Sequence, residues 1–125
     1  MGLYDMVMIK DNHKNAAGSL EKAMKMVHDT TRGFRVEVEV ENCDEAATAA
    51  AEGCDVIMLD NMSNAEIIEA SRRIRAINSE VKIEVSGGIT IERLPSLGTL
   101  DIDFISCGAL THSVRAVDIS MEIDV

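Results

Sequence analysis

Side chains able to do chemistry recur directly after short apolar segments of this 125-residue chain. The clusters are Asp11-Asn12-His13 after 6–10, three glutamates within 36–41, Asp60-Asn61 after 56–59, Ser86-Gly87-Gly88 after 83–85, and Cys107-Gly108-Ala109 after 104–106. Successive clusters are roughly 20–30 residues apart, which leaves room for one strand, one helix and two loops. Reactive groups placed repeatedly at the carboxyl ends of strands are typical of the active-site face of an α/β barrel. The pattern therefore predicts an enzyme.

The first candidate site is acidic. Glu37, Glu39 and Glu41 alternate with valines, so the three carboxylates share one face of a strand. Carboxylates that face the inside of a sheet need a partner such as Lys, Arg or Mg²⁺. Asp60, at the end of the next apolar segment, is expected to join them. The alternative is an edge strand with a solvated acidic face, and this segment alone leaves both interpretations open.

The second candidate site is a pair of glycine-containing loops. Ser86-Gly87-Gly88 and, one unit later, Cys107-Gly108-Ala109 each follow a strand. Glycines at such positions let backbone N–H groups approach an anion, and a following helix N-terminus adds partial positive charge. Either loop alone is equally consistent with a simple turn. Two such loops on the last consecutive strands match the usual phosphate site of barrel enzymes.

The third candidate site combines Lys10, His13 and His112. A lysine at the mouth of a barrel can neutralise a pyrophosphate or a substrate carboxylate. Histidines in loops are more often surface polar groups, so position alone leaves the roles of His13 and His112 open. Cys107 is expected to be partly exposed near the glycine loops, and the other cysteines are expected to act as small buried apolar residues.

The elements that position these residues alternate between strands and helices, which predicts one α/β domain with about five parallel strands. Strands are expected over 5–10 and 35–41 and in the later apolar segments. Helices are expected from Ser19 to about His28, over 45–52, after the capping box Ser63-Asn64-Ala65-Glu66, and after Thr90. The third helix is expected to bury Ile67, Ile68, Ile74 and Ile77. A closed eight-stranded barrel needs about 250 residues, so only a partial barrel is predicted.

Composition excludes several classes of function. The net charge of −10 argues against binding to nucleic acid or to anionic membranes, which favour clustered Lys and Arg. Cys43, Cys54 and Cys107 lack zinc-ligand spacing, and reduced thiols are expected. From the sequence we expect no signal peptide and no membrane-spanning segment. A cytoplasmic location is therefore expected.

The motifs also resemble a known family. Gly2-Leu3-Tyr4-Asp5, Ile9 to His13, 36–42, Met58-Leu59-Asp60-Asn61, Val85-Ser86-Gly87-Gly88-Ile89 and Gly108-Ala109-Leu110-Thr111-His112-Ser113 occur in the order found in the C-terminal half of quinolinate phosphoribosyltransferases, also called carboxylating nicotinate-nucleotide pyrophosphorylases. The resemblance covers essentially residues 1–125. It implies the type II phosphoribosyltransferase fold, with a partial (β/α) barrel. It also implies transfer of phosphoribose from phosphoribosyl pyrophosphate to quinolinate, with Mg²⁺, to give nicotinate mononucleotide, CO₂ and pyrophosphate in NAD synthesis.

The resemblance implies particular roles. Lys10 corresponds to a lysine that meets the substrate anions, and Glu39 and Asp60 to carboxylates that hold the ribose hydroxyls directly or through Mg²⁺. The residues that correspond to the 5-phosphate cradle or border it are Ser86, Gly87, Gly88, Gly108, Ala109 and His112. His13 is a further candidate for substrate contact. The complete enzymes of the family are expected to be homodimers or larger.

The resemblance also implies missing parts. Complete members carry an N-terminal domain and the first barrel strands ahead of this region, including a Thr-Arg-Lys-Thr motif and a segment ending in His-Arg that bind quinolinate. The chain is therefore expected to be a fragment, a split gene product or a truncated form, with little or no turnover alone. The resemblance leaves the substrate open, because relatives that act on nicotinate and quinolinate-like proteins linked to molybdate uptake genes could share this half. The alternative from another class is a non-catalytic half-barrel that binds phosphate or a partner chain.

Overall fold

The computed structural model describes residues 5–112 and 116–123. Its strands are β1 (Met6–Ile9), β2 (Arg35–Val40), β3 (Val56–Asp60), β4 (Lys82–Ser86) and β5 (Phe104–Ile105). Its helices are α1 (Asp11–Ala17), α2 (Leu20–Thr30), α3 (Cys43–Ala51), α4 (Asn64–Ile77) and α5 (Leu94–Leu97), followed by the 3₁₀ turn η1 (Gly108–Leu110). The motif residues Gly2, Leu3, Tyr4 and Ser113 lie outside the described residues.

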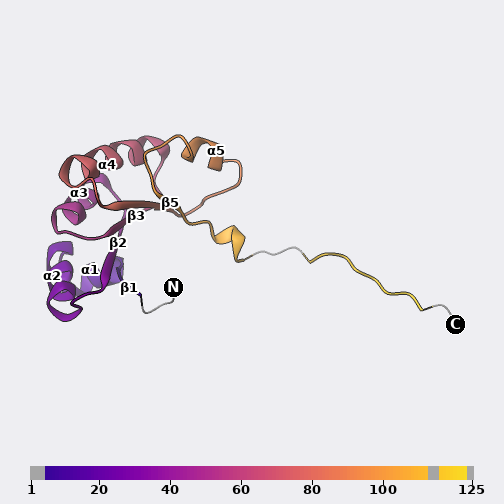
Figure 1. Cartoon of the computed structure of the whole chain (residues 1–125), viewed down its shortest axis with the longest axis horizontal. Helices are drawn as coiled ribbons and strands as arrows, with labels where there is room; N and C mark the ends of the chain where they lie inside the picture. Colours follow the sequence, from indigo (N-terminus) through magenta and orange to yellow (C-terminus); the bar gives the residue numbers. More distant parts are fainter. Residues whose placement is uncertain (1–4, 113–115, 124–125) are drawn as a thin grey trace.

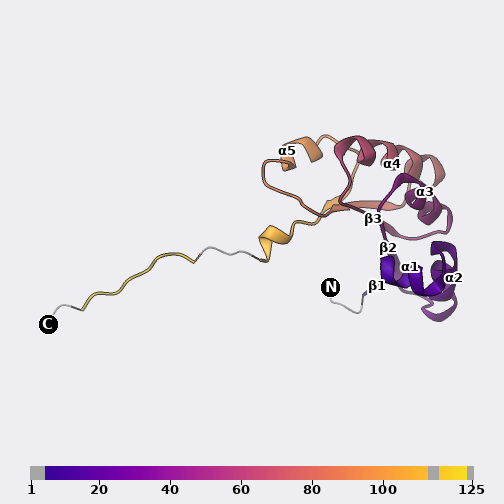
Figure 2. The same ribbon diagram turned by 180° about the vertical axis from the view of Figure 1, so that it is seen from behind.

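The five strands form one parallel sheet in the order β1-β2-β3-β4-β5. Each strand therefore pairs with its neighbours in the sequence. The helices pack along one side of the curved sheet, and the described tail, 116–123, runs away from the body (Figures 1 and 2). All strand carboxyl ends consequently meet at one edge, as the sequence predicted. This arrangement confirms the α/β prediction.

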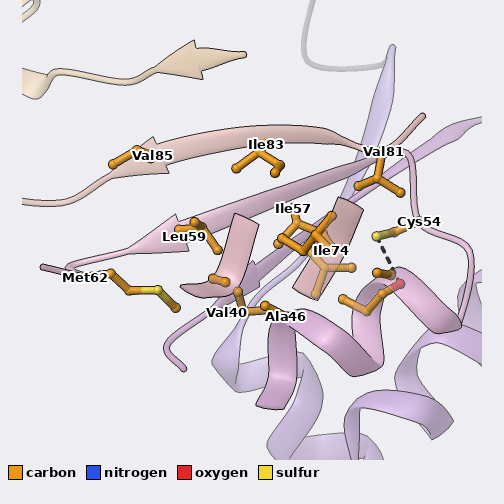
Figure 3. Close-up of a cluster of buried hydrophobic side chains, with 14 of the residues drawn as sticks. Val40, Ala46, Cys54, Ile57, Leu59, Met62, Ile74, Val81, Ile83 and Val85 are labelled. Carbon is orange, nitrogen blue, oxygen red and sulfur yellow. Dashed lines mark hydrogen bonds between the residues drawn. The ribbon is translucent and has the colours of Figure 1, made fainter. Parts of the chain in front are cut away.

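The alternation of residue types along each strand separates the two faces of the sheet. Val38 of β2 lies beside Ile9 of β1 and Ile57 of β3, and all three belong to the aliphatic core under the helices. Figure 3 shows part of this core, in which Leu59 and Ile83 of the sheet face Ala46 and Ile74 of α3 and α4. The opposite face, which we call the inner face, carries the side chains in alternate positions, including the glutamates of β2.

Polar caps begin three of the helices at or near the expected places. The Ser19 hydroxyl accepts a hydrogen bond from Lys22 N, and the Asn42 side chain accepts bonds from the backbone of Asp44 and Glu45. Ser63 and Glu66 form the predicted capping box. Capping oxygens satisfy N–H groups that have no partner within the helix, so these residues fix where the chain turns back.

Several expectations about the helices are wrong. The prediction that Ile68 and Ile77 are buried fails, because both are about half exposed, and Ala70 and Ser71 are buried instead. Thr90 does not cap a helix, since it lies in a turn and α5 begins only at Leu94. Asp11-Asn12-His13 was expected as a loop but forms the first turn of α1.

The edge-strand interpretation of the acidic segment is also wrong. β2 pairs with β1 on one side and β3 on the other, so it is an interior strand. Glu37 is 2% exposed and Glu39 is half-buried, whereas Glu41 lies beyond the strand and is exposed. The carboxylates therefore belong to the inner face and not to a solvated edge.

The three cysteines are all free thiols and differ in their exposure. Cys54 is buried, and its thiol lies 3.1 Å from Ala49 O (Figure 3). Cys43 is partly exposed, contrary to expectation, while Cys107 is partly exposed as expected. Within the described ranges, no helix has both the length and the apolar character needed to cross a bilayer.

Asp103 ties the amino end of β4 to α4, and its loss should weaken the fold. Its carboxylate accepts hydrogen bonds from Ile83 N, Arg75 Nη2 and Lys82 Nζ, each at 2.9 Å. Burial opposes its ionisation, but these bonds outweigh that effect and lower its pKa to about 2. Asp103→Ala should reduce the free energy of unfolding in urea by about 2 kcal/mol at pH 7, because the backbone N–H and two cations lose a partner.

The exposed neighbour Asp101 provides the control, since it pairs with Arg75 at 3.2 Å but is 68% exposed. Asp101→Ala should change stability by no more than about 0.5 kcal/mol. Because the folded pKa of Asp103 is depressed, its contribution should decline as the pH falls from about 4 toward 2. Equal losses for both variants would contradict this role.

Candidate functional site

A row of polar side chains crosses the carboxyl edge of the inner face. Lys10 follows β1, Glu39 lies in β2, Asp60 ends β3, Ser86 ends β4 and Ser106 follows β5. The register places Asp60 beside Ser86, and Lys10 and Ser106 continue the same face beyond the last paired residues. The row therefore runs from a cation through two carboxylates to two hydroxyls. As the sequence predicted, Asp60 lies at the end of the strand next to β2, on the same face as Glu39.

Lys10 and Glu39 form the best-defined pair in this row. Lys10 Nζ donates to Glu39 Oε2 at 2.8 Å. This hydrogen bond and the charge of Glu39, with smaller effects from Asp60 and Asp11, raise the pKa of Lys10. Lys10 thus stays protonated at neutral pH, while about half of its side chain remains exposed and able to meet an anion.

Asp60 lies beside the first glycine loop. Its Oδ2 accepts a hydrogen bond from Asn61 Nδ2 at 2.7 Å, and Asn61 N donates to Ser86 O at 3.0 Å. Gly87 has a positive φ of 81°, and a Cβ built on it would lie 2.7 Å from Asp60 Oδ1. Only glycine gives the loop this close approach to the carboxylate.

Both glycine loops line one pocket of about 630 Å³. Its lining comprises Ser86, Gly87, Gly88, Ile89, Thr90, Ser106, Cys107, Gly108, Ala109, Thr111 and His112. The six loop and histidine residues singled out as a phosphate cradle are thus brought together. Four of the lining residues carry hydroxyl groups (Ser86, Thr90, Ser106 and Thr111). Together with backbone N–H groups of the loops, these hydroxyls suit a phosphate bound by hydrogen bonds in an acidic protein.

The second loop is closed by His112. His112 N donates to Gly108 O at 3.0 Å, and a Cβ on Gly108 would lie 2.7 Å from His112 Nε2. Gly108 therefore makes space for the imidazole against the loop. His112 lines the pocket, so its imidazole ring places a potential N–H donor there.

Glu37 lies two residues before Glu39 on the same face and deeper in the sheet. It is buried, and its Oε1 has no hydrogen-bond partner within 5–112 and 116–123. Burial and then the charge of Glu84 raise its pKa to about 7, against a smaller opposing effect of Lys10. A carboxylate of this kind is held partly protonated at neutral pH.

His13 lies apart from the loop pocket. Its Nδ1 accepts a hydrogen bond from Lys10 N at 3.0 Å, so the ring helps to begin α1. The side chain lines an apolar groove formed by β1, α1 and α2. Its expected contact with substrate stays a prediction.

Sequence reasoning missed two polar residues at this edge. Lys14 is largely buried and donates to Glu39 O at 3.2 Å and to Glu45 Oε2 at 2.7 Å, which fastens α1 to β2 and α3. Ser106 lies in the pocket and shares a short hydrogen bond with Glu84. Ser106 carried a usable signal, because it directly follows the apolar residue Ile105 at the end of a strand, just as Ser86 follows Val85. Lys14 carried none, since its role depends on a helix that was not expected.

Replacement of Gly87 tests the packing of the loop against Asp60. Gly87→Ala should reduce the free energy of unfolding by more than the roughly 1–2 kcal/mol that a left-handed backbone costs, because the new methyl also displaces Asp60 and Asn61. Gly53→Ala is the matched control, since Gly53 has a similar φ of 80° and no atom within 4 Å of a built Cβ. Urea unfolding of both variants should separate the two contributions, and equal losses would contradict the close contact.

A parallel sheet with helices on one side and polar groups gathered at the carboxyl edge of its other face defines an α/β protein of the barrel type. The chain belongs to the family described as quinolinate phosphoribosyl transferase, C-terminal domain, whose model matches residues 1–122. The resemblance seen in the sequence motifs is thereby confirmed.

Individual relatives agree with the family match. The chain is 44% identical over 124 residues to the "Probable nicotinate-nucleotide pyrophosphorylase [carboxylating]" of Archaeoglobus fulgidus, covering 97% of this chain and 47% of that protein. It is 41% identical over 120 residues to the nicotinate-nucleotide pyrophosphorylase [carboxylating] of Rattus norvegicus, covering 94% and 40%.

The crystal structure of NadC from Streptococcus pyogenes matches with a TM-score of 0.85 and 42% identity, over 97% of this chain and 42% of that one. The chain thus spans less than half the length of these relatives.

Proposed function

We propose that this chain forms the phosphoribosyl-binding side of the active site of a quinolinate phosphoribosyltransferase. The proposed reaction joins quinolinate to phosphoribosyl pyrophosphate and releases pyrophosphate and CO₂, giving nicotinate mononucleotide. The observation that carries the proposal is the continuous edge of Lys10, Glu39 and Asp60 beside the pocket of Ser86 and Gly108. This edge offers one place for anions, one for ribose hydroxyls and one for a phosphate.

Each group then has a task in the reaction. The loop pocket holds the 5-phosphate through backbone N–H groups and hydroxyls. Glu39 and Asp60 hold the ribose hydroxyls and stabilise the positive charge that grows on the ring as pyrophosphate leaves C1. Lys10 offsets the charge of the substrate anions. The ring nitrogen of quinolinate attacks C1, and its new positive charge stabilises the electron pair that stays on the adjacent ring carbon when the carboxylate leaves as CO₂. A proton from water then takes the place of the carboxylate on that carbon.

Glu39 and Asp60 also fit a site for Mg²⁺. Among the described residues there is no group of three or more His, Cys, Asp or Glu side chains that could hold a metal. Mg²⁺ is nevertheless usually held by one or two carboxylates together with substrate phosphates and water. Lys10 donates to one oxygen of Glu39, and Asn61 donates to one oxygen of Asp60, so these two bonds leave the other oxygen of each carboxylate for a metal ion. When bound, Mg²⁺ supplies charge neutralisation for the pyrophosphate. Assembly of the complete enzyme as a homodimer or larger oligomer and a cytoplasmic location remain predictions.

The experiment that tests this function uses what we call the joined polypeptide. It consists of the part of Streptococcus pyogenes NadC that precedes the matched region, followed by this chain from Met1. We expect the joined polypeptide to form nicotinate mononucleotide from quinolinate and phosphoribosyl pyrophosphate with Mg²⁺, and the 125-residue chain alone to form little or none. A folded joined polypeptide that neither binds phosphoribosyl pyrophosphate nor forms product would refute the proposal. Turnover by the 125-residue chain alone would refute the expectation that part of the active site lies in the polypeptide that precedes it.

A further inference from the structure

The inner face of the sheet holds a buried acidic group, Glu37, that has no partner among the residues that the structure describes. Glu37 is 2% exposed, and its Oε1 accepts no hydrogen bond from any residue in 5–112 or 116–123. Its inner-face neighbours in β3, Val56 and Met58, are also buried but lie outside the core cluster under the helices. A buried carboxylate is costly unless a cation or several donors satisfy it. The described residues therefore supply no partner with which Glu37 could stay ionised at little cost.

The cations nearest to Glu37 on the inner face are bound elsewhere or exposed. Lys10 Nζ is held by Glu39 at 2.8 Å, and Lys82 Nζ is held by Asp103 at 2.9 Å. Arg35, at the start of β2, is exposed. The remaining charged neighbours, Glu39 and Glu84, have the same sign as Glu37. This charge pattern is complementary to a lysine or arginine arriving from outside the described sheet.

The edge of the sheet nearest to Glu37 is open to such a side chain. β1 pairs with β2 on one side, and its other edge has no described strand beside it. Glu37 lies beside Met8 of β1 in the register, so one strand separates it from that edge. A strand added beside β1 would lie about 10 Å from β2, near enough for a long basic side chain to span most of the gap across Met8. The chain covers 42% of Streptococcus pyogenes NadC, so that protein contains further polypeptide from which such a strand could come.

We propose that Glu37 is the docking point for a lysine or arginine of the polypeptide that completes the sheet beside β1. The resulting buried ion pair fixes the register between the added polypeptide and β1. Lys10 then remains paired with Glu39 and available to the substrate. This inference concerns assembly and does not depend on the proposed reaction, so its test measures stability and geometry and not turnover.

The test compares Glu37→Gln in two settings, the chain alone and the joined polypeptide, at pH 8. In the chain alone the substitution removes an unpaired buried charge, so the urea midpoint should rise. In the joined polypeptide it leaves the docked cation without its partner, so the urea midpoint should fall. Glu41→Gln removes the same charge from an exposed position next to the strand, and it should leave both midpoints nearly unchanged.

A rise in both settings, or no change in the joined polypeptide, would overturn the proposal. A crystal structure of the joined polypeptide provides the second measurement, which does not depend on the folding of any variant. A lysine or arginine nitrogen from the NadC part within 4 Å of a Glu37 carboxylate oxygen is expected. If no such nitrogen is found there, the docking assignment is wrong whatever the stability measurements give.

Discussion

Glu39→Gln in the joined polypeptide is expected to lower kcat/KM for nicotinate mononucleotide formation by about 10²–10³-fold, the size typical of losing one fixed group that stabilises transition-state charge. The amide has nearly the same shape but no charge, so it cannot balance the positive charge that develops on the ribose. It also removes the ionic partner of Lys10, which lies 2.8 Å away. Most of the loss should appear in kcat, because the interaction strengthens as the leaving group departs.

The control for this prediction is Glu41→Gln, a substitution at the exposed glutamate that follows β2. It should leave kcat/KM within about twofold, because exposed charges contribute little. Asp60→Asn should resemble Glu39→Gln. If Glu39→Gln changed only KM, or changed nothing, the proposed contact with the reacting ribose would be wrong.

The stability of the chain alone should depend on pH through Glu37. The pKa of this carboxyl is raised to about 7 in the folded chain from 4.5 in the unfolded chain. Between these values the folded state binds more protons than the unfolded state, so the free energy of unfolding decreases as the pH rises from about 4.5 to about 7. A shift of this size corresponds to about 3 kcal/mol. Below pH 4.5 the group is neutral in both states and its stabilising effect is complete.

Urea unfolding of the chain at several pH values checks this dependence. Glu37→Gln should remove most of the decrease between pH 4.5 and 7.5, while Glu41→Gln, with its exposed side chain, should retain it. A wild-type profile that is flat over this range, or one that Glu37→Gln leaves unaltered, would show that Glu37 ionises normally.

The parts of the fold that follow from residue periodicity could be predicted from the sequence. The alternation of valine and glutamate over 36–41 assigned the two faces of β2 correctly, because successive side chains in a strand point to opposite sides. The placement of Glu39, Asp60 and Ser86 at one edge followed from the parallel order of the strands. The two glycine loops came together for the same reason.

Other parts depend on contacts that periodicity does not encode. α1 has no buried residue, so it gave no apolar repeat, and its polar first turn was interpreted as a loop. In α4 the buried residues Ile67, Ala70, Ser71 and Ile74 follow the i, i+3, i+4, i+7 spacing. Ile68 and Ile77 were expected on that face because they are apolar, but the contacts of the core leave both about half exposed. The sequence alone could not decide whether Glu37 is buried in an interior strand or exposed on an edge strand. That difference depends on which strands lie beside β2.

The consecutive strand order has a consequence for folding and for evolution. Since every strand pairs with the one before it in the sequence, each β-α unit can be added to the growing sheet as it leaves the ribosome, without waiting for distant segments. Such a sheet can also be divided between any two units while all pairings on each side stay intact. The same architecture therefore permits modular growth, in which one half of a barrel is inherited, exchanged or recombined as a unit.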